Sequence, residues 1–283
     1  MLERSPPWLL VIAAAVSVQA GAVIAFNLFD EVGPRGAVLL RLGFAALLLL
    51  PFSRGALRAS RGRPVGWVLL FGLVLAAMNS LFYQALARVP LGVAVTVEFV
   101  GPLVLAVALS RRLLDLVWVA LAAAGVLLLG APASDVDRAG IAFALGAGAC
   151  WALYVVVGKR VSATWPLRSG LTASIVVAAV VLLPIGLASS GEQLADAGVL
   201  ARGLAVAVLS SVIPYGLELA ALRRLSASTF SILLSLGPAI AALVGAVVLH
   251  QTPEPLEAVA IACVVAASIG SSRAARQALP PPD

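Results

Sequence analysis

Ten long apolar stretches, separated by short polar connections, constrain this chain more than any other feature of its sequence. Each stretch has about twenty residues, the length of helix that crosses the ~30 Å hydrocarbon core of a bilayer. The chain is 62% hydrophobic and only 11% charged, whereas a soluble domain carries about 25% charged residues. These values exclude a water-soluble globular fold and indicate a polytopic membrane protein. The stretches cover about residues 8–28, 33–52, 65–86, 91–109, 113–131, 139–158, 166–188, 202–222, 226–249 and 255–272.

The apolar stretches are continuous, without the alternation of apolar and polar side chains that is typical of a membrane β-barrel strand. Only helices and closed barrels satisfy every backbone polar group inside a bilayer. We therefore predict an all-α membrane protein with ten transmembrane helices.

Basic residues gather in alternate connections. If the N-terminus is cytoplasmic, most of the 19 Lys and Arg residues fall in cytoplasmic connections, as in 54–63, 111–112 and 223–224. Cytoplasmic loops of membrane proteins carry such an excess, so we predict that both termini are cytoplasmic. The net charge of +6 is then a topology signal. Because the basic residues form short clusters between apolar runs, nucleic acid is not an expected partner.

Two short strings recur in the sequence at one spacing. Residues 85–88 (Ala-Leu-Ala-Arg) align with 221–224 (Ala-Leu-Arg-Arg), and the same offset places Gly101-Pro102 on Gly237-Pro238. Proline frees a backbone carbonyl that must find another partner, so both Gly-Pro pairs are predicted helix breaks at equivalent positions.

The recurring strings predict two repeats, residues 1–132 and residues 133–283, with five helices each. Because five is an odd number, the two repeats face opposite ways across the membrane. Many secondary transporters are built from inverted repeats, with alternating access around a site at the repeat interface near the midplane, and paired broken helices are a pointer to that site.

Three charged residues lie inside the predicted helices: Arg41, Glu98 and Glu218. An ionisable residue at a helix centre costs ~2.5–3.5 kcal/mol on insertion scales, so each should face a cavity or a partner. At about 1.5 Å per residue, Arg41 and Glu98 lie at similar depths below the outer surface. Glu98 either forms a structural ion pair with Arg41 or holds a proton or a substrate amino group. Glu218 lies near the cytoplasmic mouth.

Uncharged polar and aromatic side chains also fall within the predicted spans. They are candidates to bind a small polar solute along a translocation path. The alternative for each is a hydrogen bond between helices or an anchor at the membrane interface. These candidates are Gln19, Asn79, Tyr83, Trp151, Tyr154, Tyr215 and Ser235.

The sequence lacks the motifs of several other functions. It has no His-Glu-x-x-His zinc motif, nucleophile elbow or phosphate-binding glycine loop, and no repeated selectivity loop of a channel. Cys150 and Cys263 both lie in apolar stretches, without disulfide or metal-ligand spacing. We therefore predict a carrier of small solutes, with no enzymatic activity, cofactor or metal.

Four strings inside the predicted helices carry a family resemblance. They are 78–83 (Met-Asn-Ser-Leu-Phe-Tyr), 98–102 (Glu-Phe-Val-Gly-Pro), 145–152 (Leu-Gly-Ala-Gly-Ala-Cys-Trp-Ala) and 214–218 (Pro-Tyr-Gly-Leu-Glu). They resemble the EamA-type exporters of threonine and homoserine, which belong to the drug/metabolite transporter superfamily. The resemblance extends from about residue 8 to residue 272.

The resemblance implies ten helices in two inverted repeats and a location in the bacterial inner membrane. It implies efflux of small neutral amino acids, such as threonine and homoserine, driven by protons as the coupling ion. It also favours Glu98 and Glu218 as polar groups of the translocation path. The alternative is a broad-specificity exporter of drugs or other metabolites from the same superfamily.

Overall fold

The computed structural model describes residues 6–59, 62–110, 116–129, 136–214, 217, 221, 224–225, 230 and 233–277. Every regular element within these ranges is helical, so the predicted all-α class is confirmed. The elements are α1 (Pro7–Asn27), α2 (Phe29–Ala59), α3 (Gly66–Leu86), α4 (Leu91–Glu98), α5 (Val100–Ser110), α6 (Leu116–Leu129), α7 (Arg138–Thr164), α8 (Leu167–Ser190), the 3-10 turn η2 (Gly191–Ala195), α9 (Ala197–Ala207), the π-turn η3 (Val208–Val212), α12 (Gly237–Val248) and α13 (Pro255–Gln277).

The described helices form ten apolar segments. Five of them are long and apolar enough to cross a membrane, and the other five are shorter apolar helices. Each one overlaps a stretch that the sequence marks as a span. The predicted set of apolar helices is therefore present in the described part of the chain.

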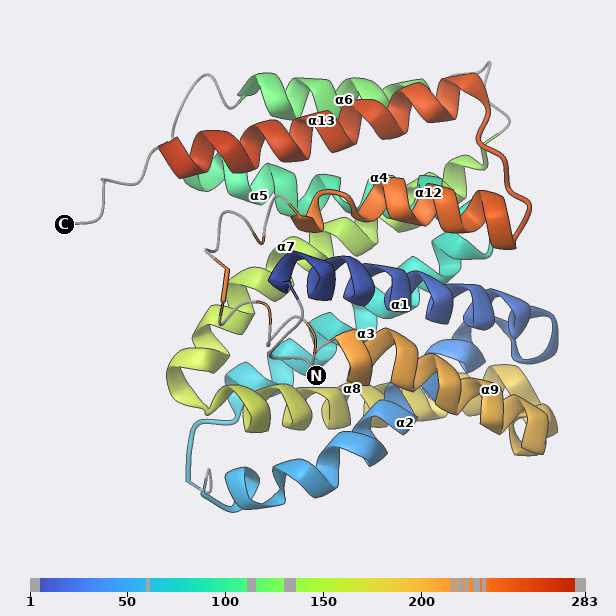
Figure 1. The fold of residues 1–283 in the computed structure, drawn as a ribbon. Helices are drawn as coiled ribbons and strands as arrows, with labels where there is room; N and C mark the ends of the chain where they lie inside the picture. Colours follow the sequence, from blue (N-terminus) through green and yellow to red (C-terminus); the bar gives the residue numbers. More distant parts are fainter. Residues whose placement is uncertain are drawn as a thin grey trace.

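Successive helices run between two ends of the bundle (Figure 1). At one end, which we call the Glu31 end, the backbone N–H of Leu91 donates to Oε1 of Gln251 at 3.0 Å. At the other, which we call the Arg63 end, Nε1 of Trp165 donates to the carbonyl of Pro64 at 2.9 Å. The sequence predicts that the Arg63 end is cytoplasmic.

Helices that are distant in sequence pack side by side. α6 lies along α13 at one edge of the bundle, and α2 lies along α8 at the opposite edge (Figure 1). α3 packs against both α7 and α8. The largest buried apolar cluster includes Leu42, Leu75 and Ile175, from α2, α3 and α8.

α2 begins at Phe29, earlier than the predicted position 33. Its first turn is separated from the rest by Gly33, which has φ 65° and ψ 172°. Glycine adopts this conformation without a Cβ clash, and Pro34 follows, whose fixed φ suits the start of a helix. The apolar stretch alone did not reveal this first turn, because Asp30 and Glu31 interrupt it.

Both Gly-Pro pairs lie in the first turn of a helix. α4 ends at Glu98, and α5 begins at Val100, just before Gly101-Pro102. α12 begins at Gly237, and Pro238 is its second residue. Proline is tolerated in a first helical turn because its missing N–H would have no helical partner there.

Candidate functional site

Several buried polar side-chain atoms in the described part of the chain have no hydrogen-bond partner in the protein. Four of them come from consecutive helices or the π-turn: Gln19 Oε1, Arg41 Nε, Tyr83 OH and Ser210 Oγ. Gln19, Tyr83 and Ser210 are each no more than 5% exposed. Buried polar groups are nearly always paired in native proteins, so each exception calls for an explanation such as a functional role.

Arg41 reaches across from α2 to the π-turn. Its Nη2 donates to the backbone carbonyl of Ser210 at 3.2 Å. In an α-helix this carbonyl would accept from residue 214, but Pro214 has no N–H to donate and its ring clashes with that carbonyl. The proline therefore explains the local π-turn, and it leaves the Ser210 carbonyl, which accepts from Arg41, without its α-helical donor.

Helix α1 packs closely against this π-turn. The hydroxyl of Ser17 donates to the carbonyl of Leu209 at 2.7 Å. One turn further, a Cβ on Gly21 would overlap Oγ of Ser210. The same Cβ would lie 3.2 Å from the backbone nitrogen of Ser210, so glycine gives the π-turn room to pack against α1.

Tyr83 lies beside Arg41. The Arg41 guanidinium carbon is 5.8 Å from the centre of the Tyr83 ring, a distance at which a cation and an aromatic face attract each other. Phe29 covers another side of the ring, with centroids 5.8 Å apart. Asn79, one turn earlier on α3, is also buried, and its Nδ2 donates to the carbonyl of Leu75 at 2.9 Å.

Glu98 is the last residue of α4 and is half-buried. Arg41 acts on its carboxylate through space. Both residues are described, and no Arg41 nitrogen lies within ion-pair distance of that carboxylate. The sequence reasoning gave them the same depth; the structure gives Arg41 a backbone carbonyl as its direct partner.

A buried apolar cluster joins the face of α1 that carries Gln19 to residues of α4 and α12. Ala22 and Val23, three and four residues after Gln19, pack in one cluster with Val95 of α4. Residues at this spacing share a helix face, and Glu98 follows Val95 by three residues on α4. Gln19 and Glu98 therefore lie on helix faces that border this cluster.

The backbone at the helix break after Glu98 packs against Gly148 of α7. Pro102 removes the N–H that would pair with the Glu98 carbonyl in a continuous helix. A Cβ on Gly148 would lie 2.5 Å from that carbonyl oxygen, and one on Gly101 would overlap the Gly148 carbonyl. The two backbones can approach this closely only because both residues are glycine.

Two aromatic rings and the second break adjoin this point. Trp151 meets Phe99 edge to face, with centroids 4.8 Å apart. The Phe99 ring also covers Gly237, where a Cβ would lie 2.8 Å from its Cζ. The structure thus brings both Gly-Pro breaks and Trp151 together, next to Glu98.

The remaining predicted residues occupy other positions. Tyr154 stacks against Phe71, with centroids 4.7 Å apart, and lines a cavity of about 430 Å³ that also includes Lys159. Ser235 is buried in the turn before α12. Tyr215 and Glu218 lie outside the described residues.

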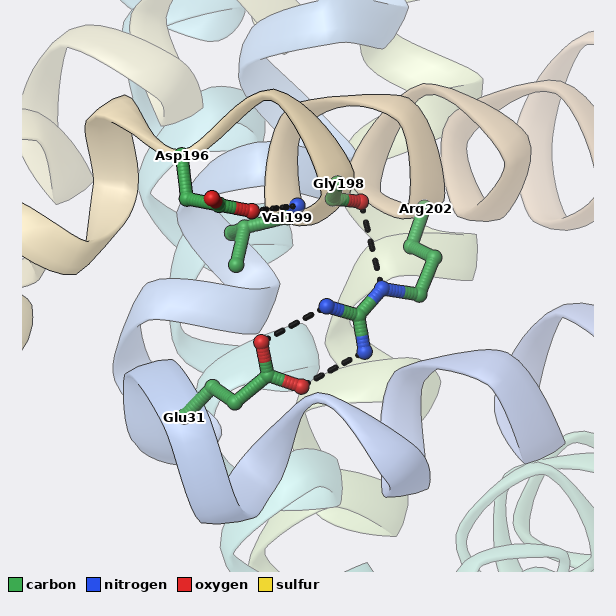
Figure 2. Close-up of polar contacts among 5 residues, drawn as sticks. All are labelled: Glu31, Asp196, Gly198, Val199 and Arg202. Carbon is green, nitrogen blue, oxygen red and sulfur yellow. Dashed lines mark hydrogen bonds and ion pairs between the residues drawn. The ribbon is translucent and has the colours of Figure 1, made fainter.

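A separate charged group lies at the Glu31 end (Figure 2). Arg202 makes two hydrogen bonds of 2.6 Å to the Glu31 carboxylate, and its Nε donates to the carbonyl of Gly198 at 3.1 Å. Beside it, the Asp196 carboxylate accepts from the N–H of Val199 at 2.9 Å and caps α9. The two side chains of the ion pair are 38% and 41% exposed.

Ser210 is a member of this site that the sequence reasoning missed. The available signal was Pro214, four residues later, because a proline inside an apolar stretch leaves the carbonyl of the fourth residue before it unpaired. The identity of the donor, Arg41, depends on how α2 packs and is not readable from that signal.

Comparison with known proteins finds relatives over nearly the whole chain. The threonine/homoserine exporter RhtA of Escherichia coli (strain K12) is 42% identical over 98% of this chain and 95% of its own length. The exporter of the same name from Salmonella typhimurium (strain LT2) is 42% identical over 97% of this chain and 95% of its own. A solved crystal structure, 18% identical, shares the fold with a TM-score of 0.65 over 96% of this chain and 99% of that one.

A family model matches the second half of the chain. It is that of the EamA-like transporter family, and it matches residues 138–273. Together with the relatives and the apolar helices, this confirms the predicted multi-pass protein of the inner membrane. The chain belongs to the EamA-like transporter family.

Proposed function

We propose that this protein exports small neutral amino acids, such as threonine and homoserine, from the cytoplasm. The observation that carries the proposal is the 42% identity to the threonine/homoserine exporter RhtA over 98% of the chain. A transporter with so much of the same sequence is expected to bind solutes of the same class.

The polar residues described above form what we call the polar cluster: Gln19, Arg41, Tyr83, Glu98 and Ser210. The chemistry of this cluster suits a zwitterionic amino acid. Arg41 offers an Nε without a partner, and a guanidinium binds a carboxylate strongly through charge-assisted hydrogen bonds. Glu98 offers a carboxylate and Gln19 an amide oxygen to an ammonium group. The hydroxyls of Tyr83 and Ser210, which have no partner in the protein, suit the side-chain hydroxyl of threonine or homoserine.

In the proposed proton antiport, Glu98 binds both the proton and the ammonium group of the substrate, one at a time. A carboxylate inside a membrane binds either a proton or a cation, and the two compete for the same oxygens. Binding of the substrate ammonium releases the proton, and protonation releases the substrate. Each cycle then exchanges one for the other.

Alternating access follows from two inverted repeats, residues 1–132 and 133–283. In support, α4 and α12 each adjoin a Gly-Pro break, run in opposite directions and pack closely, since a Cβ on Gly92 would lie 2.8 Å from Cα of Ala242. Two equivalent broken helices that cross at a repeat interface are typical of secondary transporters.

A growth assay tests the substrate. We expect expression in a threonine-sensitive bacterial host to raise its tolerance to threonine and homoserine. Expression of the Glu98→Gln variant should leave the tolerance of the host at the level without the protein. Gained tolerance to cationic dyes without gained tolerance to either amino acid would instead indicate a broad-specificity drug exporter.

A further inference from the structure

A cavity of about 540 Å³ at the Glu31 end lies apart from the proposed amino-acid site. It is framed by one face each of α2, α3, α7 and α8. Its volume is within the ~300–1,000 Å³ that small-molecule sites occupy. Its lining contains two arginines, Arg35 and Arg88, and no acidic residue among the described residues that form it.

The two arginines mark the mouth of this cavity. Both are exposed. Arg88 is held in place, because its Nη1 donates to the carbonyl of Gln84 at 2.7 Å and to the Gln84 side chain at 2.8 Å, and its guanidinium lies 4.8 Å from the Phe143 ring centre. The nearby Glu31 carboxylate is already paired with Arg202. The lining of this cavity therefore carries two positive charges and no described carboxylate, while Arg88 also borders a neighbouring pocket that contains Glu254 and Glu257.

Below the arginines the lining is mostly apolar. Leu81, Leu182 and Ile185 line it, together with Val38, which lies one turn below Arg35 on the same face of α2. On α3, the lining reaches Ser80, about 12 Å along the helix axis from Arg88 at 1.5 Å per residue. The cavity thus combines a cationic mouth with an apolar interior.

The flank of the cavity faces the hydrocarbon. Ile185 is 46% exposed, and Val180, Leu183 and Leu187 on the same helix are 63%, 48% and 51% exposed. In a multi-pass membrane protein, such an apolar exterior contacts lipid chains. A ligand in this cavity can therefore enter from the bilayer.

We infer that this cavity binds an anionic phospholipid, with its phosphate between Arg35 and Arg88 and the upper part of an acyl chain against Leu81 and Ile185. Basic pockets between membrane helices bind anionic head groups at the cytoplasmic face, and the same chemistry is proposed here for the opposite face. A free phosphate or an amino-acid carboxylate satisfies the arginines but leaves the apolar interior unfilled.

Native mass spectrometry of the purified full chain, titrated with phosphatidylglycerol, tests this inference. We expect the double substitution Arg35→Gln and Arg88→Gln to weaken phosphatidylglycerol retention about tenfold or more. The charge-keeping variant with lysine at both positions should stay close to wild type. The matched control, Glu31→Gln combined with Arg202→Gln, removes both charges of the ion pair at the same end, and retention should not change.

Three outcomes would overturn the inference. They are unchanged retention in the glutamine double variant, equal retention of phosphatidylcholine, and displacement of the lipid by millimolar inorganic phosphate or threonine, which would assign the arginines to a soluble anion. Because both arginines are exposed, the glutamine variant is expected to fold. A monodisperse elution profile with an unchanged unfolding temperature checks this.

Discussion

Arg41 and Arg202 belong to facing helices, yet their surroundings differ. Arg202 is exposed at the Glu31 end and has two hydrogen bonds to a carboxylate and one to a carbonyl. Arg41 lies within the bundle, donates to one carbonyl and keeps a buried Nε without a partner. Arg202 has the geometry of a completed structural contact, whereas Arg41 retains capacity for a ligand.

The energetics of the two arginines differ in the same sense. Exposed ion pairs contribute little to stability, because water screens them and two long side chains must be ordered. An incompletely paired guanidinium inside a membrane protein is expensive, and such residues mark substrate or ion pathways. The contrast predicts that Arg41 matters for transport and that Arg202 does not.

The largest effect is expected at Arg41. Arg41→Gln removes the proposed partner of the substrate carboxylate, and the loss of a charged hydrogen bond corresponds to roughly a 10–100-fold loss of transport. Uptake of labelled threonine into inverted vesicles measures it, with the amount of protein in the membrane as control. If the Arg41→Gln variant took up threonine at the wild-type rate, Arg41 would not be part of the substrate site.

Glu98→Gln tests the second charged group of the cluster. The substitution keeps the shape of the side chain but removes both its charge and its ability to exchange a proton. We expect proton-driven transport to be abolished while the protein level in the membrane is unchanged. Loss of the protein together with loss of transport would support a purely structural role for Glu98.

Two glycines on α7, Gly146 and Gly148, allow the effect of close packing on stability to be measured apart from the effect of helix propensity. A Cβ on Gly148 would lie 2.5 Å from the Glu98 carbonyl oxygen, whereas one on Gly146 meets only the end of the Leu81 side chain at 3.3 Å. Gly148→Ala should therefore cost about 1–3 kcal/mol by overpacking. Gly146→Ala has the same gain in helix propensity without the overlap, so its unfolding temperature in detergent should equal or exceed that of the wild type.

Equal unfolding temperatures for these two alanine variants would show that the break after Glu98 does not depend on its contact with Gly148. Transport by Gly148→Ala should fall with its stability, because the displaced backbone carries Glu98.

Tyr83→Phe removes a buried hydroxyl that has no partner in the protein. Arg41 is the polar neighbour of this hydroxyl, but no hydrogen bond of standard geometry is lost, so the unfolding temperature should change little. Loss of a neutral hydrogen bond to substrate corresponds to roughly a 2–10-fold decrease in transport. A lower unfolding temperature with unchanged transport would make this hydroxyl structural.

The smallest effect is expected at the exposed ion pair. Glu31→Gln and Arg202→Gln should each leave transport within about twofold of wild type, since surface pairs contribute little and are screened by salt. The measurement is the same vesicle uptake, at low and at high salt. A loss as large as that of Arg41→Gln would erase the distinction between the two arginines.

The apolar segments were predictable because a bilayer imposes both their length and their hydrophobicity. The positions of Gly101-Pro102 and Gly237-Pro238 in first turns follow from proline chemistry alone. These properties depend on a residue and its immediate neighbours along the chain.

The pairing of side chains was less predictable. Counting residues gave Arg41 and Glu98 similar depths, but it does not give the direction in which each side chain leaves its helix. The structure directs Arg41 to the Ser210 carbonyl, and this contact requires the π-turn before Pro214 as well as the packing of α2 on it. Glu31 and Arg202 likewise come from opposite halves of the chain, and no local pattern links them.

Counterflow in proteoliposomes tests the central claim most directly. Vesicles loaded with unlabelled threonine should accumulate labelled threonine through the wild-type protein and through Arg202→Gln, but not through Arg41→Gln at equal protein content. Equal counterflow by both arginine variants would contradict the proposed role of Arg41, and no counterflow of any small neutral amino acid by the wild type would contradict the proposed function itself.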